Sequence, residues 1–147
     1  MLDISETEAA YIAGIIDGEG TLTIRKKKPA AKVSHRPPHY SVTFSVSNTE
    51  ASLIHWLQNR CGGSVHYYEN RCKNCRPYAR WDLQTQQAVA LLQQVIPYLL
   101  IKNEQAKLAM EFLAHCPRGR ENPRSDNRVA LEEGFWLAMR WLNRRPR

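Results

Sequence analysis

The chain has 147 residues, and 21 Lys and Arg side chains against 14 Asp and Glu give it a formal net charge of +7. This length suits one compact domain, and a hydrophobic fraction of 43% is enough for a core, which argues against wholesale disorder. No segment approaches the roughly 20 apolar residues that span a membrane, and the acidic N-terminus does not resemble a signal peptide. We therefore expect a soluble, intracellular, basic domain.

The positive charge is unevenly placed along the chain. No acidic residue lies between Glu19 and Glu50, whereas six Lys and Arg side chains do, including the run RKKK at 25–28. Eight further arginines lie from Arg118 onward. Such an excess can serve nucleic acid, an acidic membrane surface or solubility alone, so its position on the fold has to distinguish these partners.

The first predicted element is a helix from about Glu6 to Ile16. Ser5 and Glu8 have the spacing of a capping box, which satisfies two backbone N–H groups at a helix start. Gly18 and Gly20 are expected to end this helix. Four small or acidic residues recur at i, i+3, i+4 and i+7 and so share one face: Ala10, Ala13, Gly14 and Asp17.

Two strand pairs follow, each succeeded by a helix. Alternation of polar and apolar residues predicts strands over 21–25, 40–46, 65–70 and 78–83, with Val65 and Tyr67 facing the core. A cap-like sequence at 47–50 predicts a helix to about Arg60. Further helices are predicted over 85–95, capped by Thr85, then over 103–115 and 128–143, the last with Leu131 and Leu137 among its packing residues. This order predicts an α+β fold with a four-stranded antiparallel sheet.

The two faces of the predicted sheet differ in chemistry. One is apolar, and the other gathers long donors, hydroxyls and aromatic side chains. Such a face is usually only solvated, but on a twisted ribbon it also suits the reading of base edges in the major groove, so we favour nucleic acid. The candidate DNA-binding residues are Thr21, Thr23, Arg25, Lys27, His39, Ser41, Thr43, Ser45, His66, Tyr68, Arg76, Tyr78 and Arg80.

Residues 12–20, IAGIIDGEG, resemble the signature motif of the LAGLIDADG homing endonucleases, because small, apolar, acidic and glycine positions agree in order. The predicted αββαββα order is similar to the fold of that family as far as about His115. The resemblance implies one endonuclease domain over 1–147, with a core at about 5–115 and a C-terminal loop and helix at 116–147. It also implies a saddle-like sheet backed by helices.

The resemblance further implies a site-specific double-strand DNA endonuclease of the intron-homing type. Such an enzyme cuts a long near-palindromic target with a divalent metal and leaves 3′ overhangs, in a prokaryotic cytoplasm or nucleoid or in an organelle. Because the motif occurs once, a homodimer is implied, with Ala10, Ala13, Gly14 and Asp17 at its interface; packing within a monomer is the alternative reading. A non-cleaving transcription factor and an RNA-binding intron maturase remain open as other functions.

The metal centre implied by the resemblance lies at the end of the motif. Glu19 is expected to bind Mg²⁺ or Mn²⁺ together with the carbonyl of Gly18, because these cations prefer oxygen ligands. Ca²⁺ is expected to bind without supporting cleavage.

Two more catalytic residues are implied by position. Asn48 matches a polar residue that positions water or metal in relatives, and helix capping is its other reading. Lys102 matches a lysine that projects toward the cleavage centre, and a solvated lysine at a helix start is its other reading. Ser52 stands where some relatives carry a basic residue, so either catalysis proceeds without that residue or another cation, such as Arg80, serves.

Four cysteines are too few and too irregular for a secreted disulfide framework. Cys72 and Cys75 form a CxxC pair in the basic loop between the last two strands, which is half of a zinc site. No second CxxC or HxxxH follows, so we favour unpaired thiols over a zinc site or a local disulfide.

Overall fold

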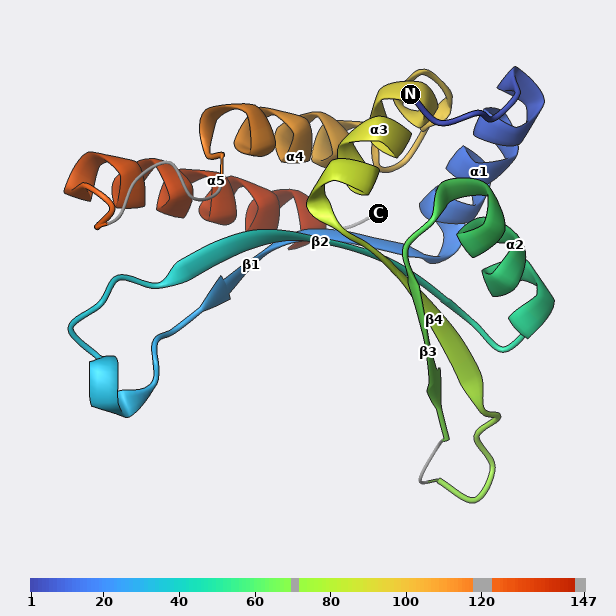
Figure 1. The fold of residues 1–147 in the computed structure, drawn as a ribbon, viewed down its shortest axis with the longest axis horizontal. Helices are drawn as coiled ribbons and strands as arrows, with labels where there is room; N and C mark the ends of the chain where they lie inside the picture. Colours follow the sequence, from blue (N-terminus) through green and yellow to red (C-terminus); the bar gives the residue numbers. More distant parts are fainter. Residues whose placement is uncertain (70–71, 118–122, 145–147) are drawn as a thin grey trace. The chain divides into compact units, whose positions relative to one another are not determined.

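The computed structural model describes residues 1–69, 72–117 and 123–144. Its elements are, in order, α1 (Glu6–Glu19), β1 (Gly20–Lys27), η1 (Ala31–Val33), β2 (His39–Asn48), α2 (Ala51–Cys61), β3 (Ser64–Tyr68), β4 (Tyr78–Leu83), α3 (Thr85–Val95), η2 (Ile96–Tyr98), α4 (Asn103–His115) and α5 (Asp126–Arg144) (Figure 1). The four strands form one sheet in the order β1-β2-β4-β3, which confirms the α+β class. No helix among the described residues is long and apolar enough to span a membrane.

The chain divides into two compact units. Unit 1 comprises residues 1–21 and 44–103, and unit 2 comprises residues 22–43 and 104–147. Strands β1 and β2 pass from one unit to the other, because the boundaries fall within them, after Thr21 and after Thr43. Each unit therefore has its own helices and its own strand segments.

In unit 1, α1, α2 and α3 cover one face of the sheet, and the β3–β4 hairpin extends beyond them (Figure 1). The inward residues of β4 are buried as predicted, and Trp81 is 0% exposed. Its indole Nε1–H donates to the carbonyl of Gly62 at 2.7 Å, so its one polar group is satisfied in the core. Phe44 contacts Trp81 edge to face, with ring centroids 5.8 Å apart.

One inward prediction for β3 is wrong. Tyr67 is 65% exposed rather than buried. Its strand lies at the edge of the sheet, where it has a neighbour on one side only. The Tyr67 hydroxyl lies 2.7 Å from Nε2 of His55 on α2, so the ring bridges to that helix at the surface.

The end of α1 also differs from its prediction. Gly18 does not stop the helix, which continues through Glu19, and Gly20 is its C-cap. The Gly20 N–H donates to the carbonyl of Ile16. A Cβ on residue 20 would lie 2.7 Å from that carbonyl oxygen, so the close approach admits only glycine.

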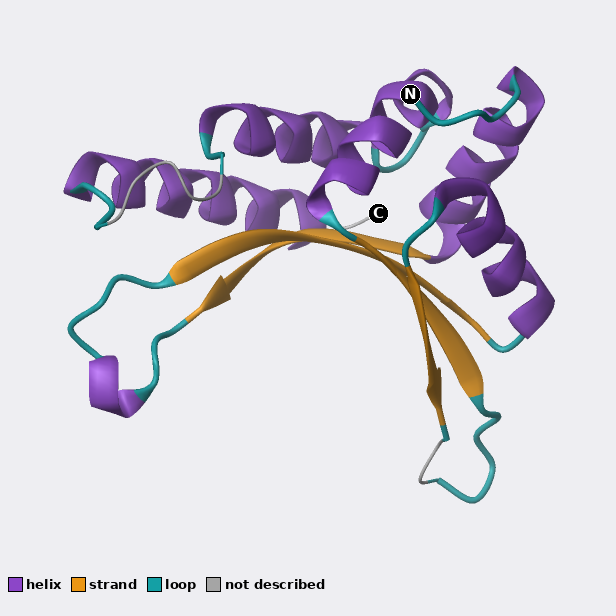
Figure 2. Ribbon diagram, in the orientation of Figure 1, coloured by secondary structure: helices purple, strands orange, loops and turns teal. Residues whose placement is uncertain are grey.

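In unit 2, α4 and α5 cover one face of the β1–β2 ribbon (Figure 2). Phe112 of α4 and Phe135 of α5 meet edge to face, with ring centroids 5.7 Å apart. The face that α5 buries differs from the predicted one, since Leu131 and Leu137 are 45% and 52% exposed. The helix instead buries Met139, at 0% exposed, and Glu132, at 4% exposed.

Glu132 is buried because two arginines neutralise it. Nε of Arg128, one turn before it on α5, donates to its Oε1 at 3.1 Å. Nη1 of Arg124 pairs with its Oε2. A buried carboxylate is tolerated only with such partners, which explains why an acidic residue faces the core.

Candidate functional site

Asp17 and Lys102 together fix the C-terminal end of α1. The Asp17 carboxylate accepts the backbone N–H groups of Leu100, Ile101 and Lys102 at 2.7, 3.2 and 2.9 Å. In return, Nζ of Lys102 donates to the carbonyls of Ile16 and Asp17 at 2.8 and 2.7 Å. Burial raises the pKa of Asp17, but the three amides and the Lys102 charge outweigh it and leave the pKa below its ordinary value.

This arrangement changes the interpretation of Lys102. The side chain is 7% exposed and is not among the residues that line the cavity described next. Carbonyls at a helix C-terminus carry partial negative charge, so a buried ammonium is stabilised there. Lys102 is therefore not the solvated lysine of a helix start, because its ammonium holds the end of α1 in place.

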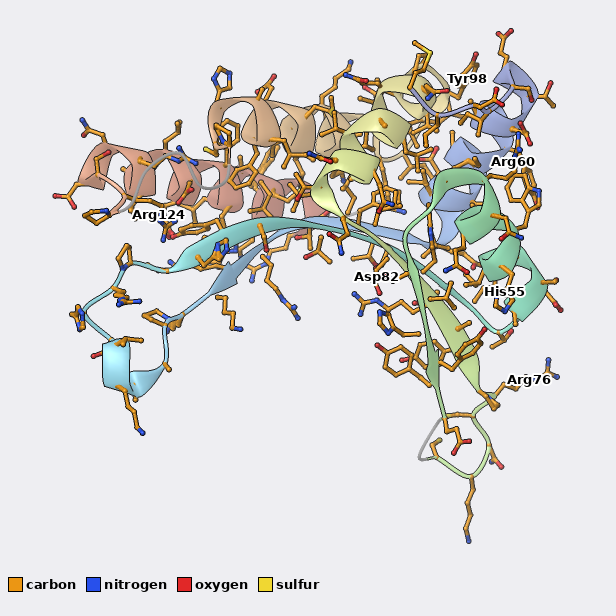
Figure 3. The ribbon with its side chains drawn as sticks, in the orientation of Figure 1. His55, Arg60, Arg76, Asp82, Tyr98 and Arg124 are labelled. Carbon is orange, nitrogen blue, oxygen red and sulfur yellow. The ribbon has the colours of Figure 1, made fainter. Side chains whose placement is uncertain are left out.

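An open cavity of about 550 Å³ lies beside the end of α1, within unit 1. Four predicted site residues, from three elements and one loop, line it: Glu19, Asn48, Arg76 and Tyr78. Two further lining residues, Ser47 and Thr49, were not predicted from the sequence. Arg76 is at the end of the loop between β3 and β4 (Figure 3). Ser47 and Thr49 flank Asn48 in the chain, and only the folded strand end shows that they face the same space.

Asn48 is the last residue of β2 and joins two parts of the site. Its Nδ2 donates to Oε2 of Glu19, and its Oδ1 accepts the Glu50 N–H at 2.7 Å. The capping alternative is not what the structure shows, because Glu50 is the N-cap of α2. Ser52, which stands where some relatives carry a basic residue, donates to Oε1 of Glu50 at 2.7 Å. Among the residues that line the cavity, the positive charge comes from Arg76 and not from Arg80.

The donors beside the cavity fit part of a hard-cation site. Glu19 is exposed, and no described residue bonds its Oε1. The Gly18 carbonyl is in the last turn of α1, where carbonyls lack helical partners and favour a cation. In the three described segments, no group of three or more His, Cys, Asp or Glu side chains is placed to hold a metal. Beside the cavity, the described residues offer one carboxylate, on Glu19, and the carbonyl of Gly18; Mg²⁺ is usually held by one or two carboxylates, with phosphate oxygens and waters as its other ligands.

Only half of the predicted dimer face is at the surface. Ala10 and Gly14 are exposed, whereas Ala13 is 0% and Asp17 7% exposed, because both pack within their own unit. A Cβ at Gly14 or Gly18 would meet no heavy atom within 4 Å. The packing of this chain therefore does not require glycine at either position.

The predicted DNA-binding residues of unit 1 lie mainly on the β3–β4 hairpin. Tyr68 and Tyr78 stack with ring centroids 5.0 Å apart, and Arg80 pairs with Asp82 on the same strand at 2.7 Å. Thr21 and His66 are exposed. The prediction that Ser45 lies on the exposed, DNA-binding face is wrong, because this residue is 5% exposed. Its short side chain lies on an interior strand, opposite Asp82.

In unit 2 the alternation of β1 is as predicted. Arg25 and Lys27 are exposed, whereas Lys26 points to α5, with Nζ 2.8 Å from Oε2 of Glu133. On the same unit His39 is exposed, and three other predicted residues are half-buried: Thr23, Ser41 and Thr43.

The four cysteines are free thiols. Cys72 and Cys75 are exposed, with Sγ atoms 2.6 Å apart. The Cys75 thiol and nearby backbone N–H groups lower the pKa of Cys72. Burial raises the pKa of Cys61 to about 11, and Cys116 is also buried. No zinc set is completed among the described residues.

The architecture is that of the LAGLIDADG homing endonucleases. The homing endonuclease I-CvuI, in complex with the I-CreI target, is 18% identical, with a TM-score of 0.73 over 97% of this chain and 85% of that one. The archaeal intron-encoded I-Vdi141I, complexed with DNA, is 14% identical, with a TM-score of 0.75 over 97% and 87%. I-SmaMI, bound to cleaved DNA, is 13% identical, with a TM-score of 0.65 over 89% of this chain and 43% of that one.

The sequence matches no family model and no curated protein. At these identities the structural likeness establishes the fold. It confirms, at the level of the fold, the family that residues 12–20 resemble.

Proposed function

We propose that this protein is a site-specific double-strand DNA endonuclease that acts as a homodimer with a divalent metal. The observation that carries the proposal is the cavity in which Glu19, at the end of the motif helix, meets Asn48 and Arg76. Proteins of the same fold support it, because I-CvuI and I-Vdi141I were solved with DNA and I-SmaMI with cleaved DNA.

Each residue of the cavity has a distinct role in this proposal. Glu19 and the Gly18 carbonyl would hold the cation, and Mg²⁺ or Mn²⁺ supplies charge that stabilises the phosphate oxygens during hydrolysis. Asn48 orients the Glu19 carboxylate through its amide. Arg76 gives the cavity a cation that can bind a phosphate of the cleaved strand. Lys102 acts indirectly, because its ammonium binds the carbonyls of the helix turn that carries Glu19.

Three observations favour a second copy of the chain. One copy supplies a single carboxylate, and the open space at Gly14 and Gly18 would let another helix approach closely. The chain spans 85% of I-CvuI but only 43% of I-SmaMI, so a second copy of this chain would be needed to match the full length of I-SmaMI. A symmetric pair would bring two Glu19 carboxylates together and read a near-palindromic target, leaving 3′ overhangs as the family resemblance implies.

The nuclease is tested by removing one charge. Targets are first selected by binding from a random duplex library, and cleavage is then measured with Mg²⁺. The Glu19→Gln protein is expected to bind the target as wild type does but to cut it at least ~100-fold more slowly. Glu111→Gln, which changes an exposed carboxylate on α4, is the matched control. Tight, specific binding without cutting by wild type would favour a transcription factor instead.

The homodimer is tested with two glycines that both lie in helices and both have open space. Gly14→Ala and Gly134→Ala should each stabilise their helix by up to about 1 kcal/mol. Only Gly14→Ala is expected to weaken self-association in sedimentation velocity. Equal association of both variants would contradict an interface at Gly14, and a monomeric wild type that still cuts both strands would contradict the dimer.

A further inference from the structure

The β3–β4 hairpin carries a charged group that the cavity does not use. Arg80 and Asp82 are two residues apart on one face of β4, and His66 lies opposite Arg80 on β3. Their side chains are 36%, 27% and 56% exposed. Asp82 is on the side of the hairpin away from α2 (Figure 3). This face is one of those that the proposed function directs toward DNA.

Asp82 occupies one edge of the Arg80 guanidinium. Nε and Nη2 of Arg80 both donate to Oδ1 of Asp82, at 2.9 and 2.7 Å. A guanidinium has five N–H donors in one plane. Bonding through the Nε edge leaves the two parallel N–H groups at the tip, one on Nη1 and one on Nη2, pointing along the side chain. No other described residue accepts from them.

Neither the stability of the fold nor non-specific attraction to DNA accounts for a carboxylate at position 82. A partly exposed ion pair of this kind contributes about 0–1 kcal/mol to stability. A carboxylate on a DNA-facing surface also repels phosphates, which lowers non-specific affinity. Its effect on Arg80 is different: it restricts a flexible side chain to one rotamer and so reduces the entropy lost on binding.

The exposed fork of Arg80 matches one base. Guanine presents the acceptors O6 and N7 side by side in the major groove, and a two-donor contact from Arg is the commonest specific contact to it. A phosphate would also accept two such bonds. Asp82 favours the base, because its own charge opposes the approach of a phosphate to the same guanidinium.

We propose that Arg80, held by Asp82, reads a guanine in the major groove of each half of the target. Arg80 is the specificity-determining residue, and Asp82 is a positioning residue that acts through it. This inference rests on the proposed function in that a homodimer of the chain must bind duplex DNA sequence-specifically.

The test is a selection of bound sequences from a random duplex library, without divalent metal so that no DNA is cut. Wild type should select sites with a fixed guanine, related by symmetry in the two halves. Arg80→Ala should lose the preference at that position alone, by about 10-fold or more, with other positions unchanged. Lys107→Ala, which removes one exposed charge from α4, should weaken binding slightly without altering any base preference.

Asp82→Asn separates positioning from electrostatics. If Asp82 positions Arg80, the variant loses discrimination for the guanine several-fold even though its net charge is more positive. If binding becomes tighter on all sequences with the guanine preference unchanged, the positioning role is overturned. Glu111→Gln has the same charge change on α4 and should leave the selected sequence as in wild type.

The two proposals fail in different ways. A wild-type protein that selects no sequence contradicts the proposed function. A wild-type protein that selects a defined site, none of whose bases changes in Arg80→Ala, overturns the reading of guanine and leaves the endonuclease proposal intact.

Discussion

Units 1 and 2 bury charge in different ways. In unit 1, Asp17 and Lys102 direct their charges at backbone amides and carbonyls. In unit 2, Glu132 and Glu133 are bonded by other side chains, namely Arg124, Arg128, Lys26 and Tyr40. A backbone group in a helix or turn cannot rotate away from its partner, whereas a long side chain can. Charge in unit 1 therefore fixes the helix end that carries Glu19, and charge in unit 2 attaches a helix to a sheet.

The chain contains a natural reporter for each unit. Cys61 lies in unit 1 and Cys116 in unit 2, and both are buried. In a background with Cys72→Ser and Cys75→Ser, thiol labelling followed by peptide mass spectrometry measures the opening of each unit separately. Labelling of these two cysteines therefore shows which unit a substitution destabilises.

The largest effect is expected from Lys102→Met. Removing the ammonium leaves the buried carbonyls of Ile16 and Asp17 without their donor and removes the positive charge near the Asp17 carboxylate, which keeps its three backbone N–H donors. With about 1–3 kcal/mol for each unsatisfied carbonyl, the free energy of unfolding should fall by about 3–5 kcal/mol. Urea denaturation measures this loss, and Cys61 should label faster by a larger factor than Cys116. Lys107→Met, on the exposed side of α4, is the control and should change little. Equal acceleration at both cysteines would mean that the two units open as one.

A smaller effect is expected from Glu132→Gln. The change removes a charged acceptor from Arg124 and Arg128, whose side chains are 20% and 14% exposed and so remain partly solvated. A loss of about 2 kcal/mol is expected. Labelling of Cys116 should now accelerate more than that of Cys61, the reverse of the Lys102→Met pattern. Acceleration at Cys61 alone would contradict the division of roles between the units.

The smallest effect is expected from Glu133→Gln. Its carboxylate is 32% exposed and pairs with Lys26, so the loss should not exceed about 1 kcal/mol and should shrink in 1 M salt. Hydrogen bonds from Lys26 and Tyr40 lower the pKa of Glu133. The contribution is therefore present at neutral pH and lost as the pH falls below the usual carboxyl range, where variant and wild type should converge. A difference that persists in acid would exclude the ion pair as its cause.

The sequence predicted the parts of this molecule that depend on local pattern. The strand Tyr78–Leu83 and the helix Asn103–His115 begin and end as expected, because alternation and helical periodicity are local properties. The predicted cap of the helix Thr85–Val95 is wrong, because Gln84 is its N-cap and forms a capping box with Gln87. The motif and the strand end also indicated Glu19 and Asn48 as candidate site residues, and the fold brings both to one cavity. The role of Lys102 could not be read in this way, since its carbonyl partner on Asp17 is 85 residues away in the chain.

Burial of polar groups escaped prediction for the same reason. Glu132 faces the core because Arg128 and, from the preceding loop, Arg124 neutralise it, whereas a helical pattern alone favours leucines for that position. Ser45 lies on an interior strand, yet its polar side chain and alternating position are those of an exposed residue. Pairwise neutralisation and coverage by neighbouring strands are properties of the assembled fold.

Glu19 and Gly20 are consecutive, one ending α1 and the other beginning β1, with no loop between them. One inserted residue would turn the helix by about 100° relative to the strand or exchange the two faces of β1. Surface loops accept changes of length during evolution, but this joint cannot. Grafts, tags and circular permutations of this protein should therefore avoid residues 16–22, where the number of residues sets the direction in which the Glu19 side chain points.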